Sequence, residues 1–116
     1  MADASSTDIE TDGTLIYEYE PIHNHHNLEK HWWMQAEAMI CFLNAWQLTG
    51  EQKYYHLFTN SWTSINKHII DHDKGEWIWG IHSDNPLMDH EGKVGLWNCP
   101  CHNSRACMEI IRRLEA

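Results

Sequence analysis

The densest group of reactive side chains lies near the end of the chain, in the stretch GLWNCPCHNSR at residues 95–105. His102 is placed in the first turn of a predicted helix, directly after Pro100, where a neutral imidazole is a competent general base. Arg105, one turn further on, can hold a carboxylate, a hydroxyl or a developing oxyanion. Trp97 can stack on the apolar face of a sugar ring. The stretch therefore favours acid–base chemistry on a sugar, although most histidines at helix starts are caps or surface residues.

Metal binding is the alternative chemistry for the same stretch, with Cys99, Cys101 and His102 as ligands. Structural zinc usually takes two pairs of ligands at spacings such as C-x₂₋₄-C and H-x₃₋₅-H. Here C-P-C-H is one cramped cluster, Cys107 falls on an apolar helix face, and neighbouring loop histidines point in different directions. We therefore expect no metal and no other cofactor, with the cysteines as small buried residues.

A third candidate group lies in the stretch HWWMQAEA, which contains Trp32, Trp33 and Glu37. Trp33 and Glu37 are four residues apart, so they share one face of a helix. A mostly buried Glu37 needs a partner because an unpaired buried charge is costly. The group suits sugar binding, but an equally good alternative is that Trp32 is a core residue and Glu37 forms a local salt bridge.

Two consecutive helices must position these groups. The first is predicted from about Glu29 to Thr49, closed by Gly50, and it is apolar on nearly all faces, so it is buried on most sides. The second is predicted over 51–70 and is apolar on one stripe only, as an outer helix is. The pair is the hairpin unit of an α/α barrel or solenoid. Trp46 and Trp62 are expected in the core, the latter on the outer stripe with Tyr55, Phe58, Ile65 and Ile69.

The other elements are shorter. Alternating side chains predict strands at TLIYEYE (14–20) and GEWIWGIH (75–82), while PIHNHHN (21–27) is predicted to be a loop. A last helix is expected to begin near Cys101 or His102 and to run to the end of the chain. Its predicted apolar face consists of Asn103, Cys107, Ile110, Ile111 and Leu114.

Composition limits the class of protein. The 116 residues predict one domain over 14–116, preceded by a disordered segment at 1–13. The net charge of −9 argues against nucleic acid and anionic membranes as partners. No apolar run reaches the roughly 18 residues of a membrane span, and the first residues do not resemble a signal peptide. We expect a cytoplasmic protein with reduced cysteines.

Three motifs, taken in order, resemble the C-terminal part of the N-acylglucosamine 2-epimerase superfamily, and cellobiose 2-epimerases in particular. They are KHWWMQAEAMICFLNAWQLTG, GEWIWGI and KVGLWNCPCHNSRACMEIIRRL, preceded by TDGTLIYEYE, which resembles the segment before the WW helix. The resemblance covers about residues 11–115. It implies a mainly α fold that is part of an (α/α)6 barrel with short β-strands.

The resemblance also implies a reaction. Family members invert C2 of a reducing-end sugar, using two histidines that remove and return the C2 proton of the ring-opened form. His102 maps to one of these histidines and Trp97 to the aromatic residue that lines the sugar site. Trp32, Trp33 and Glu37 map to the WW pair and to the glutamate of QAE. Arg105 is a predicted substrate-binding residue because it lies one turn after His102, and not because a family motif maps to it. The implied partner is a mono- or disaccharide with a free reducing end.

Two departures from the family pattern limit this inference. Asn98 and Cys101 stand where cellobiose epimerases usually have Lys and Tyr. Family chains are several times longer, and their partner histidine has no counterpart in these 116 residues. We therefore expect a fragment that forms a homo-oligomer, with exchanged helices as one route. Three functions stay open: part of a 2-epimerase site, a sugar-binding or self-associating module without turnover, and a small zinc domain.

Overall fold

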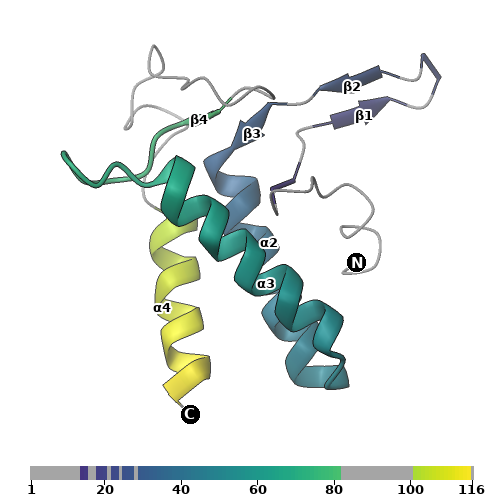
Figure 1. The fold of residues 1–116 in the computed structure, drawn as a ribbon, viewed down its shortest axis with the longest axis vertical. Helices are drawn as coiled ribbons and strands as arrows, with labels where there is room; N and C mark the ends of the chain where they lie inside the picture. The colour runs from purple at the N-terminus through teal and green to yellow at the C-terminus, as the bar shows by residue number, and fades with distance from the viewer. Residues whose placement is uncertain are drawn as a thin grey trace.

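The computed structural model describes residues 14–15, 18–20, 22–23, 25–27, 29–81 and 101–115 of the chain. Three α-helices form the framework of this part, and α2 packs against both of the others (Figure 1). Within the described ranges, every helix is too short or too polar to span a bilayer. The helices are α2 (Trp32–Thr49), α3 (Gln52–Ser64) and α4 (Cys101–Glu115), and a π-helical turn, η1 (Ile65–Ile69), continues α3.

Helix α2 has the buried character that its sequence predicts. Its largest fully buried side chains, Met39, Phe42 and Leu43, point into a core shared with α3, η1 and β4. Gly50 ends the helix in the left-handed conformation, with φ of 73°, and its N–H donates to the Trp46 carbonyl oxygen at 2.7 Å. The predicted end of this helix is confirmed, because glycine adopts this conformation without the steric cost of a Cβ.

Two small antiparallel sheets lie toward the N-terminal end of α2, and β3 contacts the helix (Figure 1). Strand β1 (Glu18–Glu20) pairs with β2 (His25–Asn27), and β3 (Lys30–His31) pairs with β4 (Gly80–Ile81). The prediction of a loop over 21–27 is wrong for β2, since its HHN sequence has no apolar alternation and forms a strand through backbone pairing with β1. The pairing of β3 also explains why α2 begins at Trp32 rather than about Glu29.

The predicted strand over 75–82 is shorter than expected. Only Gly80 and Ile81 form β4, and Ile70 and Trp77 add an isolated bridge. Gly80 lies so close to the Lys30 carbonyl oxygen that a Cβ would collide with it, which limits this position to glycine.

Helix α3 buries only part of its predicted stripe. Phe58, Ile65 and Ile69 are buried, but Tyr55 and Trp62 are exposed, Trp62 at 42%. The core assignment of Trp62 is therefore wrong, whereas Trp46 packs against the core as predicted. The buried face of α3 runs through Tyr54, Phe58 and Ser61, so Tyr55 and Trp62, each one position further along the helix, lie outside the core.

An apolar groove of about 350 Å³ separates the exposed edges of α3 and α4. The predicted apolar face of α4 is split between the core and this groove: Asn103 is buried, whereas Ile111 and Leu114 are each 54% exposed. The groove is lined by side chains from all three helices: Met39, Phe58, Trp62, Cys107, Ile110, Ile111 and Leu114.

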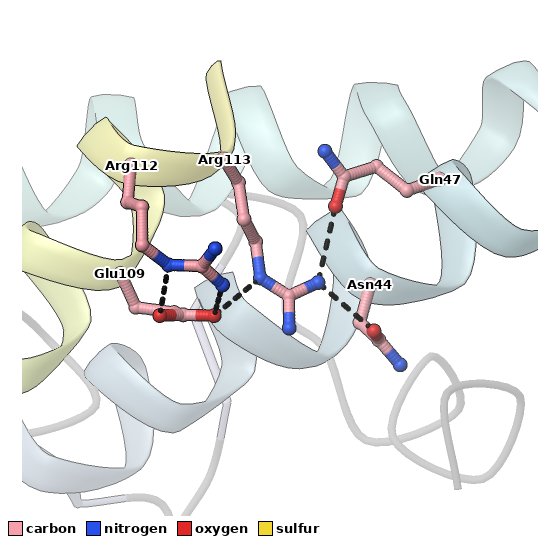
Figure 2. A network of polar contacts seen from close by, with 5 residues as sticks. All are labelled: Asn44, Gln47, Glu109, Arg112 and Arg113. Atoms are coloured by element: carbon pink, nitrogen blue, oxygen red, sulfur yellow. Dashed lines mark hydrogen bonds and ion pairs between the residues drawn. The ribbon is translucent and has the colours of Figure 1, made fainter. Parts of the chain in front are cut away.

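A polar network fastens the second half of α4 to α2 (Figure 2). Arg113 Nη1 donates to Asn44 Oδ1 and to Gln47 Oε1, each at 3.0 Å, and Arg113 Nε donates to Glu109 Oε1 at 2.7 Å. Hydrogen bonds from Arg112 and then from Arg113 lower the pKa of Glu109 to about 2. The network therefore keeps its charges at any ordinary pH and orients α4 along α2.

Burial on α2 predicts the cost of truncating two of its residues. Phe42→Ala is expected to lower the free energy of unfolding by about 3–5 kcal/mol, because a fully buried ring leaves a cavity. Leu48→Ala, at a position 77% exposed on the same helix, is expected to change it by less than about 0.5 kcal/mol. Urea unfolding followed by circular dichroism, at one protein concentration, measures both. Equal losses would contradict the assignment of the core.

Candidate active site

The carboxylate of Glu37 is the centre of a polar cluster between α2 and α4. His102 Nδ1 lies 2.9 Å from Glu37 Oε1, and Arg105 Nη2 donates to both carboxylate oxygens, at 2.5 Å to Oε2. His102 and Arg105 are three residues apart on α4, so both face α2. The packing of two helices thus joins residues 65 and 68 positions apart in the sequence.

Electrostatics keep Glu37 ionised. Partial burial raises the pKa of its carboxyl group, but hydrogen bonds from Arg105 and His102, together with their charges, outweigh burial and lower it overall. In return, the hydrogen bond and charge of Glu37 raise the pKa of Arg105. The predicted alternative of a local salt bridge is wrong, because the cationic partner comes from a different helix.

The hydrogen bond to Glu37 sets the orientation of the His102 ring. An ionised carboxylate only accepts hydrogen bonds, so His102 Nδ1 must be the donor. In the neutral ring the other nitrogen, Nε2, then carries the lone pair. The side chains of His102 and Glu37 are 40% and 37% exposed and that of Arg105 is 53% exposed, so a ligand has access to the cluster. A carboxylate that orients a histidine in this way prepares Nε2 for proton transfer.

The adjacent tryptophans have different environments. The Trp33 ring lies beside His102, with centroids 5.9 Å apart and an angle of 46° between planes, and it is 37% exposed. Trp32 is buried against Trp79, with ring centroids 4.9 Å apart, and the backbone N–H of Trp32 donates to the Trp79 carbonyl oxygen. Of the WW pair, Trp33 therefore lies in the cluster, and Trp32 lies in the core, as the alternative interpretation of the sequence proposed.

Other sequence candidates can be placed only in part. Trp97 and Cys99 lie outside the described residues. Among the residues that the structure does describe, no group of three or more His, Cys, Asp or Glu side chains is arranged to hold a metal ion. His102 directs Nδ1 at Glu37, and in this arrangement that nitrogen is not available as a metal ligand.

One contact beside the cluster was missed by the sequence analysis. The buried amide of Asn103, next to His102, donates from Nδ2 to Glu76 Oε1. Glu76 has φ of 63°, a left-handed conformation that non-glycine residues rarely adopt. The signal for this contact is weak, because glutamate is not a residue expected in such a conformation and it lies 27 positions before Asn103.

Comparisons with known proteins identify the family of the chain. Residues 1–99 match the family model of N-acylglucosamine 2-epimerase (GlcNAc 2-epimerase). The chain belongs to the N-acylglucosamine 2-epimerase family. It is 33% identical over 111 residues to a cellobiose 2-epimerase of Bacteroides fragilis, which covers 96% of this chain and 28% of the relative. It is 42% identical over 83 residues to a cellobiose 2-epimerase of Ruminococcus albus, which covers 71% of this chain and 21% of the relative.

The fold agrees with the same family. The crystal structure of a sugar epimerase from a ruminal bacterium superposes with a TM-score of 0.88 at 34% identity, covering 97% of this chain and 28% of that one. The predicted family membership and the mainly α, partial-barrel fold class are confirmed. The chain spans 21–28% of the length of these epimerase relatives, so most of a relative's barrel has no counterpart in the 116 residues.

The lowered pKa of Glu37 predicts how the cluster responds to acid. Because the folded-state pKa is below its ordinary value of 4.5, the ionised group stabilises the fold above that pH, and this contribution is lost as the pH falls through the folded-state pKa. Glu37→Gln is expected to cost about 0.5–1 kcal/mol at pH 7, after allowance for solvent screening. Its difference from wild type is expected to shrink in acid.

Urea unfolding at pH 7 and pH 3 measures this effect. A double-mutant cycle with Arg105→Gln is the control, because the coupling energy between the two changes isolates their ion pair. A difference between Glu37→Gln and wild type that is the same at both pH values would contradict the assignment.

Proposed function

We propose that the chain forms part of the active site of a carbohydrate 2-epimerase, with His102 as an acid–base group at C2 of a reducing-end sugar. The observation that carries the proposal is the Glu37–His102 hydrogen bond, which directs Nε2 of an accessible ring away from its carboxylate partner. Family membership supports the same chemistry.

The proposed step is a proton transfer on the ring-opened sugar. His102 Nε2 takes the C2 proton, and the electron pair of the C–H bond moves into the C1–C2 bond while the carbonyl oxygen gains negative charge. Return of a proton to the opposite face of C2, from an acid other than His102, re-forms the carbonyl group and gives the epimer. The reaction neither oxidises nor reduces the sugar, so proton transfer accounts for all of its bond changes.

The neighbouring residues have distinct roles in this proposal. Glu37 holds Nδ1–H and stabilises the imidazolium that forms after proton transfer. Both hydrogen bonds of Arg105 to Glu37 come from Nη2, and a guanidinium has further N–H donors that can reach the developing oxyanion. Trp33, half-exposed beside His102, offers a face for sugar stacking, and Trp97 stays a predicted second one.

The substrate class is a mono- or disaccharide with a free reducing end, such as cellobiose or an N-acylglucosamine. The relatives named as cellobiose 2-epimerases favour a disaccharide. A cytoplasmic location stays part of the proposal, because Cys41, Cys101 and Cys107 suit a reducing compartment.

Solvent exchange at C2 tests the proposal. Proton NMR of cellobiose with the chain in heavy water is expected to show loss of the reducing-end C2 proton signal, because solvent deuterium replaces the proton that His102 removes. The epimer appears only where a group on the opposite face of C2 returns the proton. His102→Gln is expected to slow the exchange about 10²–10⁴-fold, the usual contribution of a general base. Thr63→Ala, on the exposed side of α3, serves as a matched control and is expected to keep the wild-type rate. Exchange that persists in His102→Gln would contradict the role of this histidine.

A second candidate function is a sugar-binding module without turnover. Inversion at C2 needs acid–base groups on both faces of the sugar, and the family motifs map only one histidine of the pair to this chain. In that case the C2 proton signal stays unchanged over days, while cellobiose still perturbs Trp33. Trp33→Leu then removes binding, and His102→Gln changes no rate because none exists.

We further propose that the chain self-associates through the apolar groove between α3 and α4, with a second copy as the occupant. Ile111 and Leu114 line the groove. Together with Met108 they also form an exposed apolar ridge on α4, so the groove and the ridge share two residues. The ridge of one copy can therefore enter the groove of another around a two-fold axis. The ion pair of Glu109 with Arg112 lets two such helices approach without strong repulsion.

Light scattering coupled to gel filtration tests this association. The wild-type chain is expected to elute as a dimer or larger species. Ile111→Glu is expected to shift it to monomer, because burying an unpaired charge in the groove is costly. Lys67→Glu, on the polar side of η1, is the control and is expected to leave the assembly unchanged. A monomeric wild type at all concentrations would contradict the proposal.

A further inference from the structure

The turn before β4 contains an unusual pair of left-handed residues. Gly75 has φ of 76° and Glu76 has φ of 63°. Such a conformation suits glycine at the first position but is unfavourable for glutamate at the second. The rest of the turn is well bonded: Asp71 Oδ1 accepts from the N–H groups of Asp73 and Lys74. A residue that keeps a strained backbone conformation within an otherwise well-bonded turn indicates a functional role for its side chain.

The Glu76 side chain reaches the first turn of α4. Its Oε1 accepts from the Trp77 N–H at 2.9 Å and from Asn103 Nδ2. The carboxylate also lies close enough to Cys107, one turn further along α4, to help burial raise the pKa of that thiol. Glu76 thus faces the side of α4 that points into the molecule.

Asn103 depends on this contact. Its side chain is 95% buried from solvent, and within the part of the chain that the structure describes Glu76 is its hydrogen-bond partner, since Oδ1 accepts from no group there. Removal of the carboxylate would leave the whole amide buried without a partner, which is unfavourable. The buried position of Asn103 is therefore stable only while Glu76 is in place.

The direction of His102 follows from that of Asn103. Adjacent residues of a helix point about 100° apart, so an inward Asn103 fixes the rotation of α4 about its axis. With that rotation, His102 and Arg105 face Glu37 on α2. The network of Glu109, Arg113, Asn44 and Gln47 fastens α4 two to three turns further on, where it controls the tilt of the helix more than the rotation of its first turn.

We infer that Glu76 is a positioning residue for the candidate active site: through Asn103 it sets the rotation of the first turn of α4, and so directs His102 Nδ1 at Glu37. The geometric part of this inference stands without turnover. Only its consequence for catalysis rests on the proposed function.

The experiment measures the His102 tautomer by ¹⁵N-edited NMR of the ring in the full chain at pH 8, with the signal assigned by His102→Gln. Wild type is expected to show a protonated Nδ1 and an unprotonated Nε2. E76G, which fits the left-handed backbone but removes the side chain, is expected to shift the ring toward a mixture of tautomers. E76Q keeps an oxygen that can accept from Asn103 and is expected to restore the wild-type signal.

Arg113→Ala is the matched control, because it loosens the other attachment of α4 to α2. It is expected to destabilise the fold while leaving the His102 tautomer unchanged. If E76G does not fold, E76N replaces it, since asparagine tolerates the left-handed conformation and its shorter side chain does not reach Asn103. A wild-type tautomer in E76G or E76N, or an equal shift in Arg113→Ala, would overturn the inference. Loss of sugar turnover alone would not, because the tautomer is measured without sugar.

Discussion

The ionised carboxylate of Glu37 holds the candidate site together, because it accepts hydrogen bonds from two residues of a different helix at once. Glu37 is half-buried on a mostly apolar helix, so nearby donors stabilise its charge. Those donors also have to be charged or strongly polar, which His102 and Arg105 are. The requirement explains why the start of α4 meets the first half of α2. The same contact that neutralises a half-buried charge fixes the proton position on an accessible histidine.

Two sets of contacts position α4, one at each end of the helix, and they differ in physical character. At the C-terminal half, Arg112 and Arg113 surround Glu109 with charge-assisted bonds, exposed for Arg112 and partly buried for Arg113, and Arg113 extends to two amides of α2. At the first turn the attachment is a buried amide held by a carboxylate on a strained backbone. Exposed charge pairs tolerate small shifts, because water replaces a lost bond at little cost. A buried amide does not tolerate such shifts, because no water replaces its lost hydrogen bond. The Glu76–Asn103 contact therefore fixes the orientation of the first turn of α4.

Much of this fold follows from sequence periodicity, and the exceptions have identifiable causes. The end of α2 at Gly50 and the start of α4 follow from helix-capping rules and from apolar spacing. The inner and outer characters of α2 and α3 follow from how many faces are apolar. Strand β2 was missed because its HHN sequence has no apolar alternation, and Trp62 was misplaced because the buried face of α3 runs through Tyr54 and Ser61 instead of Tyr55 and Trp62.

The site itself was predictable by residue type but not by contact. Spacing along single helices pairs Trp33 with Glu37 and His102 with Arg105, and the two pairs do meet. Nothing in the local pattern selects Glu76 for Asn103, or the amide of Gln35 for the backbone N–H and carbonyl of Leu15, because these partners are set by tertiary packing. The open groove has the same origin. One face of α4 contributes His102 and Arg105 to the polar cluster, so Ile111 and Leu114, on another face of α4, point away from the core. A surface that covers this groove would hold the helix that carries His102, and association would thereby stabilise the site.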